Sequence, residues 1–105
     1  MTGGLLTDAE VAQVLSEHPG WRRADGALVR TLQMKDFPEA LAFVERVGTA
    51  AVDYGRRPDM CISEQNHVRL EIANLNHAGF TLAELRLARR VDEILGEHHP
   101  GATSR

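Results

Sequence analysis

Cysteine is almost absent from this chain, since Cys61 is the only one among its 105 residues. A single thiol excludes an intrachain disulfide and favours a reducing compartment, for which we expect the cytoplasm. Long apolar runs are also missing: none approaches the roughly 18 residues that span a bilayer, and the N-terminus lacks the pattern of a signal peptide. We therefore expect no membrane partner.

Excess positive charge is missing as well. The formal net charge is -3, which argues against a nucleic-acid partner, because phosphate contacts require a basic surface. Lysine is nearly absent, since eleven of the twelve basic residues are arginine and Lys35 is the exception. We interpret this as the codon bias of a GC-rich bacterial genome, and it lowers the weight of any single arginine.

The remaining composition is that of an ordinary globular domain. Hydrophobic residues make up 43% of the chain and charged residues 26%, values that do not indicate disorder. The length allows one core. We expect a single domain over residues 1–96, followed by a flexible tail over residues 97–105.

Three helix starts share one device, a capping oxygen three residues before a glutamate. They lie at Thr7–Glu10, Asp36–Glu39 and Thr81–Glu84. This spacing satisfies the free amide groups at a helix start. Glycine or a His-Pro-Gly sequence breaks the apolar periodicity downstream, so we expect the helices to end near Glu17, Tyr54 and Gly96.

Between these helices the apolar period changes to two, which predicts strands. The expected strands are Trp21–Arg23, Leu28–Gln33, Met60–Ser63 and Val68–Ala73. Asp25-Gly26 marks a tight turn between the first two. The order α-β-β-α-β-β-α predicts an α+β fold, with a four-stranded antiparallel sheet and three helices packed on one face.

Five sequence features follow one another along the chain: Trp21, the segment 35–43 (KDFPEALAF), Pro58-Asp59, the alternating strand 68–72 and Gly79-Phe80-Thr81. In these features the sequence resembles the pterin-4a-carbinolamine dehydratase (4a-hydroxytetrahydrobiopterin dehydratase) family over almost the whole chain. Each piece alone is weak, but the combination is fairly specific. It implies a homodimer, with a tetramer as the alternative, joined at exposed edge strands.

The resemblance also implies an active site at the ends of the second helix and the fourth strand. There the family carries Glu-x-x-x-His-His-Pro and, later, Thr-His. Its histidines act as general acid and base, eliminating water from the 4a-carbinolamine to give the quinonoid dihydropterin. Imidazole suits this role because its pKa lies near the operating pH.

This chain departs from the family at those positions. Arg56 and Arg57 replace the two histidines before Pro58, and Val52 replaces the glutamate. A gap-free alignment puts Asn74 and Leu75 where Thr-His stands in the family. A guanidinium group has a pKa above 12 and leucine transfers no proton, so the family's route of dehydration is not expected here.

Two other histidine motifs call for attention. His98-His99-Pro100 spells the family tripeptide, but it lies in the predicted tail with no acid four residues earlier, so we interpret it as coincidence. His77 aligns with the lost histidine only if the loop before Thr81 is shortened. His77 and Asn74 are nevertheless the candidate catalytic pair, since His77 is the one imidazole expected near the pocket.

The candidate ligand-binding residues are Arg56, Arg57, Tyr54, Asp59 and Asn76. Paired guanidinium groups bind carboxylate or phosphate well, and Asp53 is the one acid at helical spacing that could neutralise them. The alternative is that both arginines reflect drift after loss of the ancestral activity. We expect no metal and no cofactor.

Three functions remain open at this stage, and whether the protein is an enzyme is one of the open points. The first is a protein repurposed to bind or transform a small anionic molecule, for example in a bacterial biosynthetic pathway. The second is a non-catalytic interaction or assembly protein of the same fold. The third is a residual dehydratase, a lyase that uses His77 and Asn74.

Overall fold

The computed structural model describes residues 5–24, 26–73, 79–98 and 103–104. The elements follow in the order α1 (Asp8–Glu17), β1 (Arg22–Ala24), β2 (Ala27–Gln33), α2 (Phe37–Tyr54), β3 (Asp59–Ser63), β4 (His67–Ala73), α3 (Leu82–His98) and β5 (Thr103–Ser104). The predicted α+β fold and its order of elements are confirmed, with the short strand β5 added at the end.

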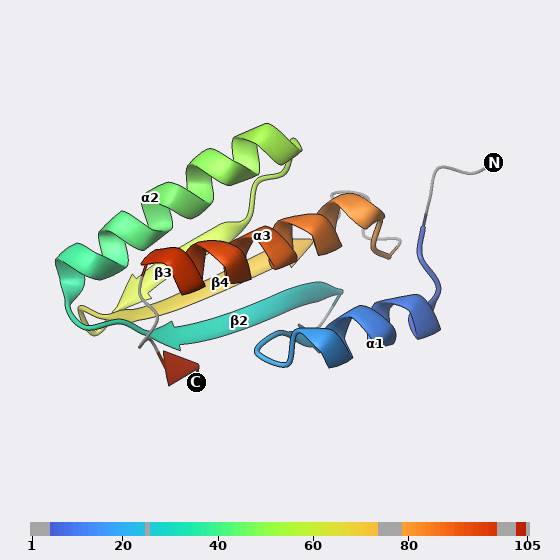
Figure 1. Ribbon diagram of the computed structural model, residues 1–105, viewed down its shortest axis with the longest axis horizontal. Coiled ribbons are helices and arrows are strands. Elements are labelled where there is room, and N and C mark those ends of the chain that lie inside the picture. The colour runs from blue at the N-terminus through green and yellow to red at the C-terminus, as the bar shows by residue number, and fades with distance from the viewer. Residues whose placement is uncertain (1–4, 25, 74–78, 99–102, 105) are drawn as a thin grey trace.

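The strands form one antiparallel sheet in the order β1-β2-β4-β3, and β5 pairs with β2. The register places Leu28 opposite Ile72 and Leu32 opposite Val68. Because side chains alternate along a strand, these residues share one face of the sheet. Helices α2 and α3 lie across the sheet, and α1 lies beside β2, toward the end where α3 begins (Figure 1).

The core lies between this sheet face and the helices. Its fully buried large side chains come from α2, from α3 and from the sheet, and they include Phe43, Val47, Leu87, Ile94, Leu28 and Leu70. Val11 of α1 belongs to the same cluster. Trp21 is also buried, so it is part of the core and not a platform for a ligand.

The helix starts follow the predicted capping chemistry. Thr7 and Glu10 form a complete capping box at α1, and the Asp36 carboxylate accepts a hydrogen bond from the Glu39 amide at α2. Gly55 ends α2 in the left-handed region, with φ of 68°, a conformation that glycine adopts at little cost.

Helix α3 continues two residues beyond Gly96, where the sequence predicted its end. Two residues of the predicted tail, Thr103 and Ser104, pair with Gln33 and Leu32 of β2. Part of the segment 97–105 is therefore built into the fold. No helix within the described ranges is long and apolar enough to cross a membrane.

Candidate functional site

The C-terminal end of α2 sets the position of Arg56 and Arg57, the two arginines expected where the resemblance implies histidines. The Gly55 amide donates to the carbonyls of Ala51 and Val52. The Arg56 amide donates to the Ala51 carbonyl at 3.0 Å. The glycine cap therefore turns the chain out of the helix, and Arg56 is the first residue after the cap.

Arg56 forms an ion pair with Glu84 in the first turn of α3. Its Nε donates to Glu84 Oε2, and its Nη1 donates to the Gly55 carbonyl at 2.9 Å. The Glu84 side chain is completely buried. Asp53 is the one acid at helical spacing from the two arginines, but the ion pair of Arg56 is with Glu84, 28 residues away.

Glu84 is also tied to the start of its own helix. Its Oε1 accepts hydrogen bonds from the Thr81 amide and from Thr81 Oγ1, the latter at 2.7 Å. Burial is the largest single effect on the Glu84 carboxyl and raises its pKa. The hydrogen bonds from Thr81 and Arg56 together outweigh burial, so the pKa of Glu84 lies below its usual value.

Arg57 differs sharply from its neighbour. Its side chain is exposed, and within the described part of the chain it has no hydrogen bond or ion pair. Asp59 is also exposed, as the first residue of β3. Of the two arginines, one is held by an internal carboxylate and one is open to solvent.

Tyr54 makes contacts of a different kind from those expected of Arg57. It is half-buried, packs against the core and lines the cleft between α2 and α3. The remaining predicted site residues, Asn74, Asn76 and His77, fall in the segment 74–78, which lies outside the described residues, as does Leu75. The part of the predicted site that Asn74, Asn76 and His77 would form therefore remains a prediction.

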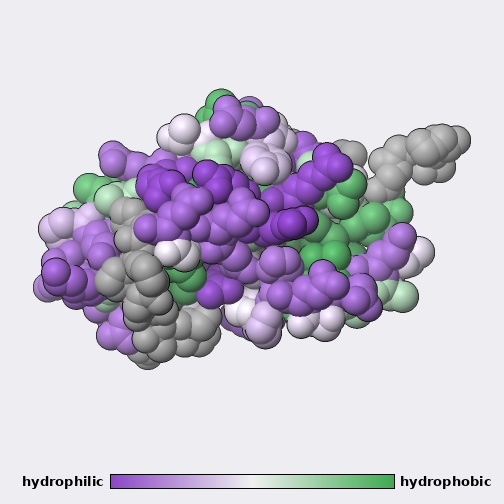
Figure 2. Space-filling view, viewed as in Figure 1, coloured by the Kyte–Doolittle hydropathy of each residue, from purple (hydrophilic) through white to green (hydrophobic). Residues whose placement is uncertain are grey.

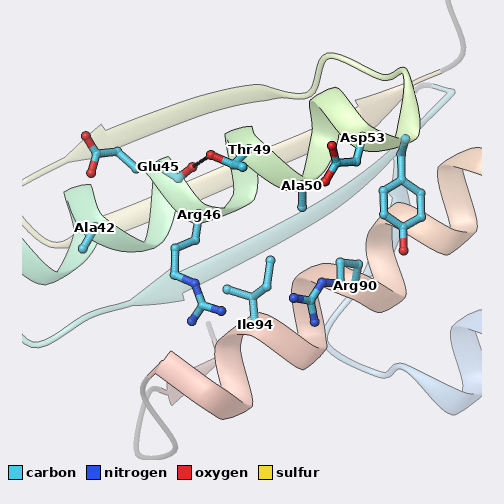
Figure 3. A pocket seen from close by; sticks show the side chains of 9 residues that line it. Ala42, Glu45, Arg46, Thr49, Ala50, Asp53, Arg90 and Ile94 are labelled. Atoms are coloured by element: carbon cyan, nitrogen blue, oxygen red, sulfur yellow. Dashed lines mark hydrogen bonds between the residues drawn. The ribbon is translucent and has the colours of Figure 1, made fainter.

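No sequence pattern indicated the cleft between α2 and α3. It has a volume of about 470 Å³ and is lined by residues of both helices, among them Arg46, Asp53, Arg90 and Ile94. Figure 3 shows Arg46 and Arg90 projecting from the two helices into the space between them. The Arg90 side chain is 32% exposed.

A cluster of polar side chains around Asp92 was also not indicated by any sequence pattern. The carboxylate of Asp92, in the middle of α3, accepts hydrogen bonds from Trp21 Nε1 at 2.9 Å and from Arg30 Nη1 at 3.1 Å. His18 Nδ1 lies 2.9 Å from the same carboxylate. The cluster joins three segments distant in sequence, so no local spacing could have revealed it.

Metal ligation finds no support in the described part of the chain. No group of three or more histidine, cysteine or acidic side chains there could hold an ion. In the sequence His98-His99-Pro100, which matches the family tripeptide by coincidence, His99 and Pro100 lie outside the described residues.

The comparisons with known proteins agree with this fold. The family model described as Pterin 4 alpha carbinolamine dehydratase matches residues 4–94. A proposed pterin-4-alpha-carbinolamine dehydratase of Thermomicrobium roseum is 42% identical over 89 residues, covering 85% of this chain and 95% of that protein. A Chloroflexus aurantiacus protein of the same description is 37% identical over 91 residues, covering 87% and 97%.

Two solved structures are similar. The transcriptional coactivator/pterin dehydratase of Brucella melitensis gives a TM-score of 0.78 at 26% identity, over 86% of this chain and 97% of that one. A pterin dehydratase-like protein described as a RuBisCO assembly factor in the alpha-carboxysome gives a TM-score of 0.58 at 17% identity, over 72% and 87%. That second likeness concerns the fold alone. On the match over residues 4–94 and the relatives' identities, this chain belongs to the pterin-4-alpha-carbinolamine dehydratase family.

Proposed function

We propose that this chain is a pterin dehydratase-like protein that does not catalyse dehydration and binds a small anionic molecule at the C-terminal end of α2. The observation that carries the proposal is the open guanidinium group of Arg57, at a position where the family carries an acid/base histidine. Arg57 cannot exchange a proton near neutral pH, but it can bind a carboxylate or phosphate.

Arg56 contributes to this site indirectly. Glu84 and the Gly55 carbonyl fix its guanidinium group, so it is a positioning residue that holds the end of α2 against the start of α3. This is a change from the expectation that both arginines bind the ligand. Arg57 supplies the charge that binds the ligand. Asp59 lies two residues further along the chain, directly after Pro58.

The loss of dehydration is tested by a stopped-flow assay coupled to an aromatic amino acid hydroxylase. We expect the rate with the protein to equal the uncatalysed rate. An acceleration of about a hundredfold, the low end for general acid–base catalysis, would contradict the proposal and favour the residual dehydratase that uses His77 and Asn74.

Anion binding is tested by titrating the ¹⁵N-labelled protein with inorganic phosphate at low salt. We expect shifts of the Arg57 and Asp59 amide signals, which weaken as salt is added. Arg57→Ala should lower the affinity about tenfold, the effect of losing one charge-assisted hydrogen bond of roughly 1.5 kcal/mol. Arg22→Ala is the matched control, because Arg22 is exposed and lies on the strand at the opposite edge of the sheet.

A second function, as a non-catalytic interaction or assembly protein, is favoured by an apolar groove between α1 and α3. The groove is lined by Leu6, Val14, Leu82 and Leu85, among others, and Leu82 is 47% exposed. Figure 2 shows hydrophobic side chains gathered at this end of the molecule. The fold is shared with the RuBisCO assembly factor named above. If phosphate leaves the Arg57 signals unchanged, this second function takes first place.

A further inference from the structure

Arg46 and Arg90 converge on a single carboxylate from opposite sides of the α2–α3 cleft. Arg46 Nη2, on α2, lies 2.9 Å from Glu97 Oε1. Arg90 Nη1, on α3, lies 3.6 Å from Glu97 Oε2. A hydrogen bond from Arg46 is the leading reason that the pKa of Glu97 lies below its usual value.

Among the described residues, the guanidinium groups of Arg46 and Arg90 have N–H donors that no acceptor uses. Each carries five N–H donors. Within the described residues, Arg46 makes one hydrogen bond, to Glu97, and Arg90 makes one, to Glu93. Their side chains are 40% and 32% exposed, so a ligand in the cleft can reach the remaining donors.

The apolar floor of the cleft is formed by Ala50 and Ile94, which are buried members of the hydrophobic core. The other lining residues include Arg46 and Arg90 and also two carboxylates, those of Glu45 and Asp53. The cleft volume of about 470 Å³ falls in the range typical of small-molecule sites. An apolar floor beside converging guanidinium groups suits a ligand with an anionic head and an apolar body.

We infer that the cleft between α2 and α3 binds a small organic anion, a carboxylate or phosphate ester on an apolar body, and that Glu97 marks the position of its anionic group. Glu97 is then an internal competitor for that position. This site is separate from the one at Arg57 and does not depend on the proposed function.

The binding test is an NMR titration of the full-length ¹⁵N-labelled protein with phenyl phosphate at low salt. We expect shifts of the Ala50 and Ile94 amides. Arg46→Ala and Arg90→Ala should each weaken the apparent affinity about tenfold, by loss of a charge-assisted contact. Glu97→Gln should tighten it severalfold, because the competing charge is removed while the side-chain shape is kept.

The main alternative is that these charges only clamp the two helices together. In that case Arg46→Ala and Glu97→Gln lower the melting temperature but leave the phenyl phosphate titration unchanged, and the inference is overturned. Arg57→Ala separates the two proposals. If it abolishes phenyl phosphate binding while Arg46→Ala does not, the ligand sits at the end of α2 and the cleft site is wrong.

Discussion

Arg56, which follows the Gly55 cap of α2, forms an ion pair with Glu84 in the first turn of α3, and the Glu84 side chain is completely buried. The resemblance to the family predicts a histidine with a proton-transfer role at the position of Arg56. Here the same position supplies a permanent positive charge to a buried carboxylate. The contact ties the C-terminal end of α2 to the start of α3.

Removing Arg56 should destabilise the protein. Arg56→Ala leaves Glu84 buried with only Thr81 as a donor, and breaking a buried ion pair in this way costs about 3 kcal/mol. Urea unfolding measures the loss, with the exposed Arg57→Ala as the matched control, for which we expect a change within about 0.5 kcal/mol. Equal losses in the two variants would show that the link does not stabilise the fold.

The same carboxyl should make stability depend on pH. Because the pKa of Glu84 is lower in the folded protein than its ordinary value of 4.5, its ionised form stabilises the fold above pH 4.5. That contribution is lost as the pH falls through the lowered folded value. We expect the stability difference between the wild type and Glu84→Gln to shrink between pH 7 and pH 3, measured by urea unfolding. A difference that stays constant over this range contradicts the assignment.

Asp92 should be more important for stability than its exposure suggests. Asp92→Ala removes the acceptor of the buried Trp21 and Arg30 donors, and each buried donor left without a partner costs about 1–3 kcal/mol. We expect a total loss of about 3 kcal/mol in thermal or urea unfolding. The neighbouring Glu93→Ala breaks only exposed ion pairs and should cost less than about 1 kcal/mol. The prediction fails if the two variants unfold alike.

The turn between β3 and β4 offers a stabilising change. Gln65 has a φ of 73°, a left-handed conformation that costs a side-chain-bearing residue roughly 1–2 kcal/mol. Glycine avoids this cost, but its greater loss of backbone entropy on folding lowers the stability by about 0.5–1 kcal/mol. Gln65→Gly should therefore raise stability by about 0.5–1 kcal/mol in thermal unfolding. A lower melting temperature would mean that contacts of the Gln65 side chain stabilise the fold by more than its backbone conformation costs.

The expected homodimer joined at edge strands remains a prediction. Strand β3 is the last in the order β1-β2-β4-β3, so one of its backbone edges can pair with a second copy. Light scattering at micromolar concentration should give the mass of a dimer or tetramer. Cys61→Lys, on β3, should shift it toward monomer, while Ala12→Lys, on the exposed surface of α1, should not. A wild-type monomer would exclude this assembly.

The amino-acid sequence by itself determined the elements, because their signals are local. Capping pairs such as Thr7 with Glu10, the period-two pattern of β4 and the glycine at the end of α2 each act within a few residues. The replacement of acid/base side chains at Arg56 and Arg57 was also predicted from the sequence alone, because it depends only on which side chain stands at a family position, and it stays a prediction.

Only the tertiary structure decided which charges meet. Arg56 pairs with Glu84 across 28 residues, and Trp21 reaches Asp92 across 71. No helical or strand spacing relates such pairs. Arg56 and Arg57 are adjacent and chemically identical, yet one is held by a buried carboxylate and the other is open to solvent. The packing of α3 against α2 makes that distinction, because it brings a buried carboxylate to one guanidinium group and leaves the other facing water.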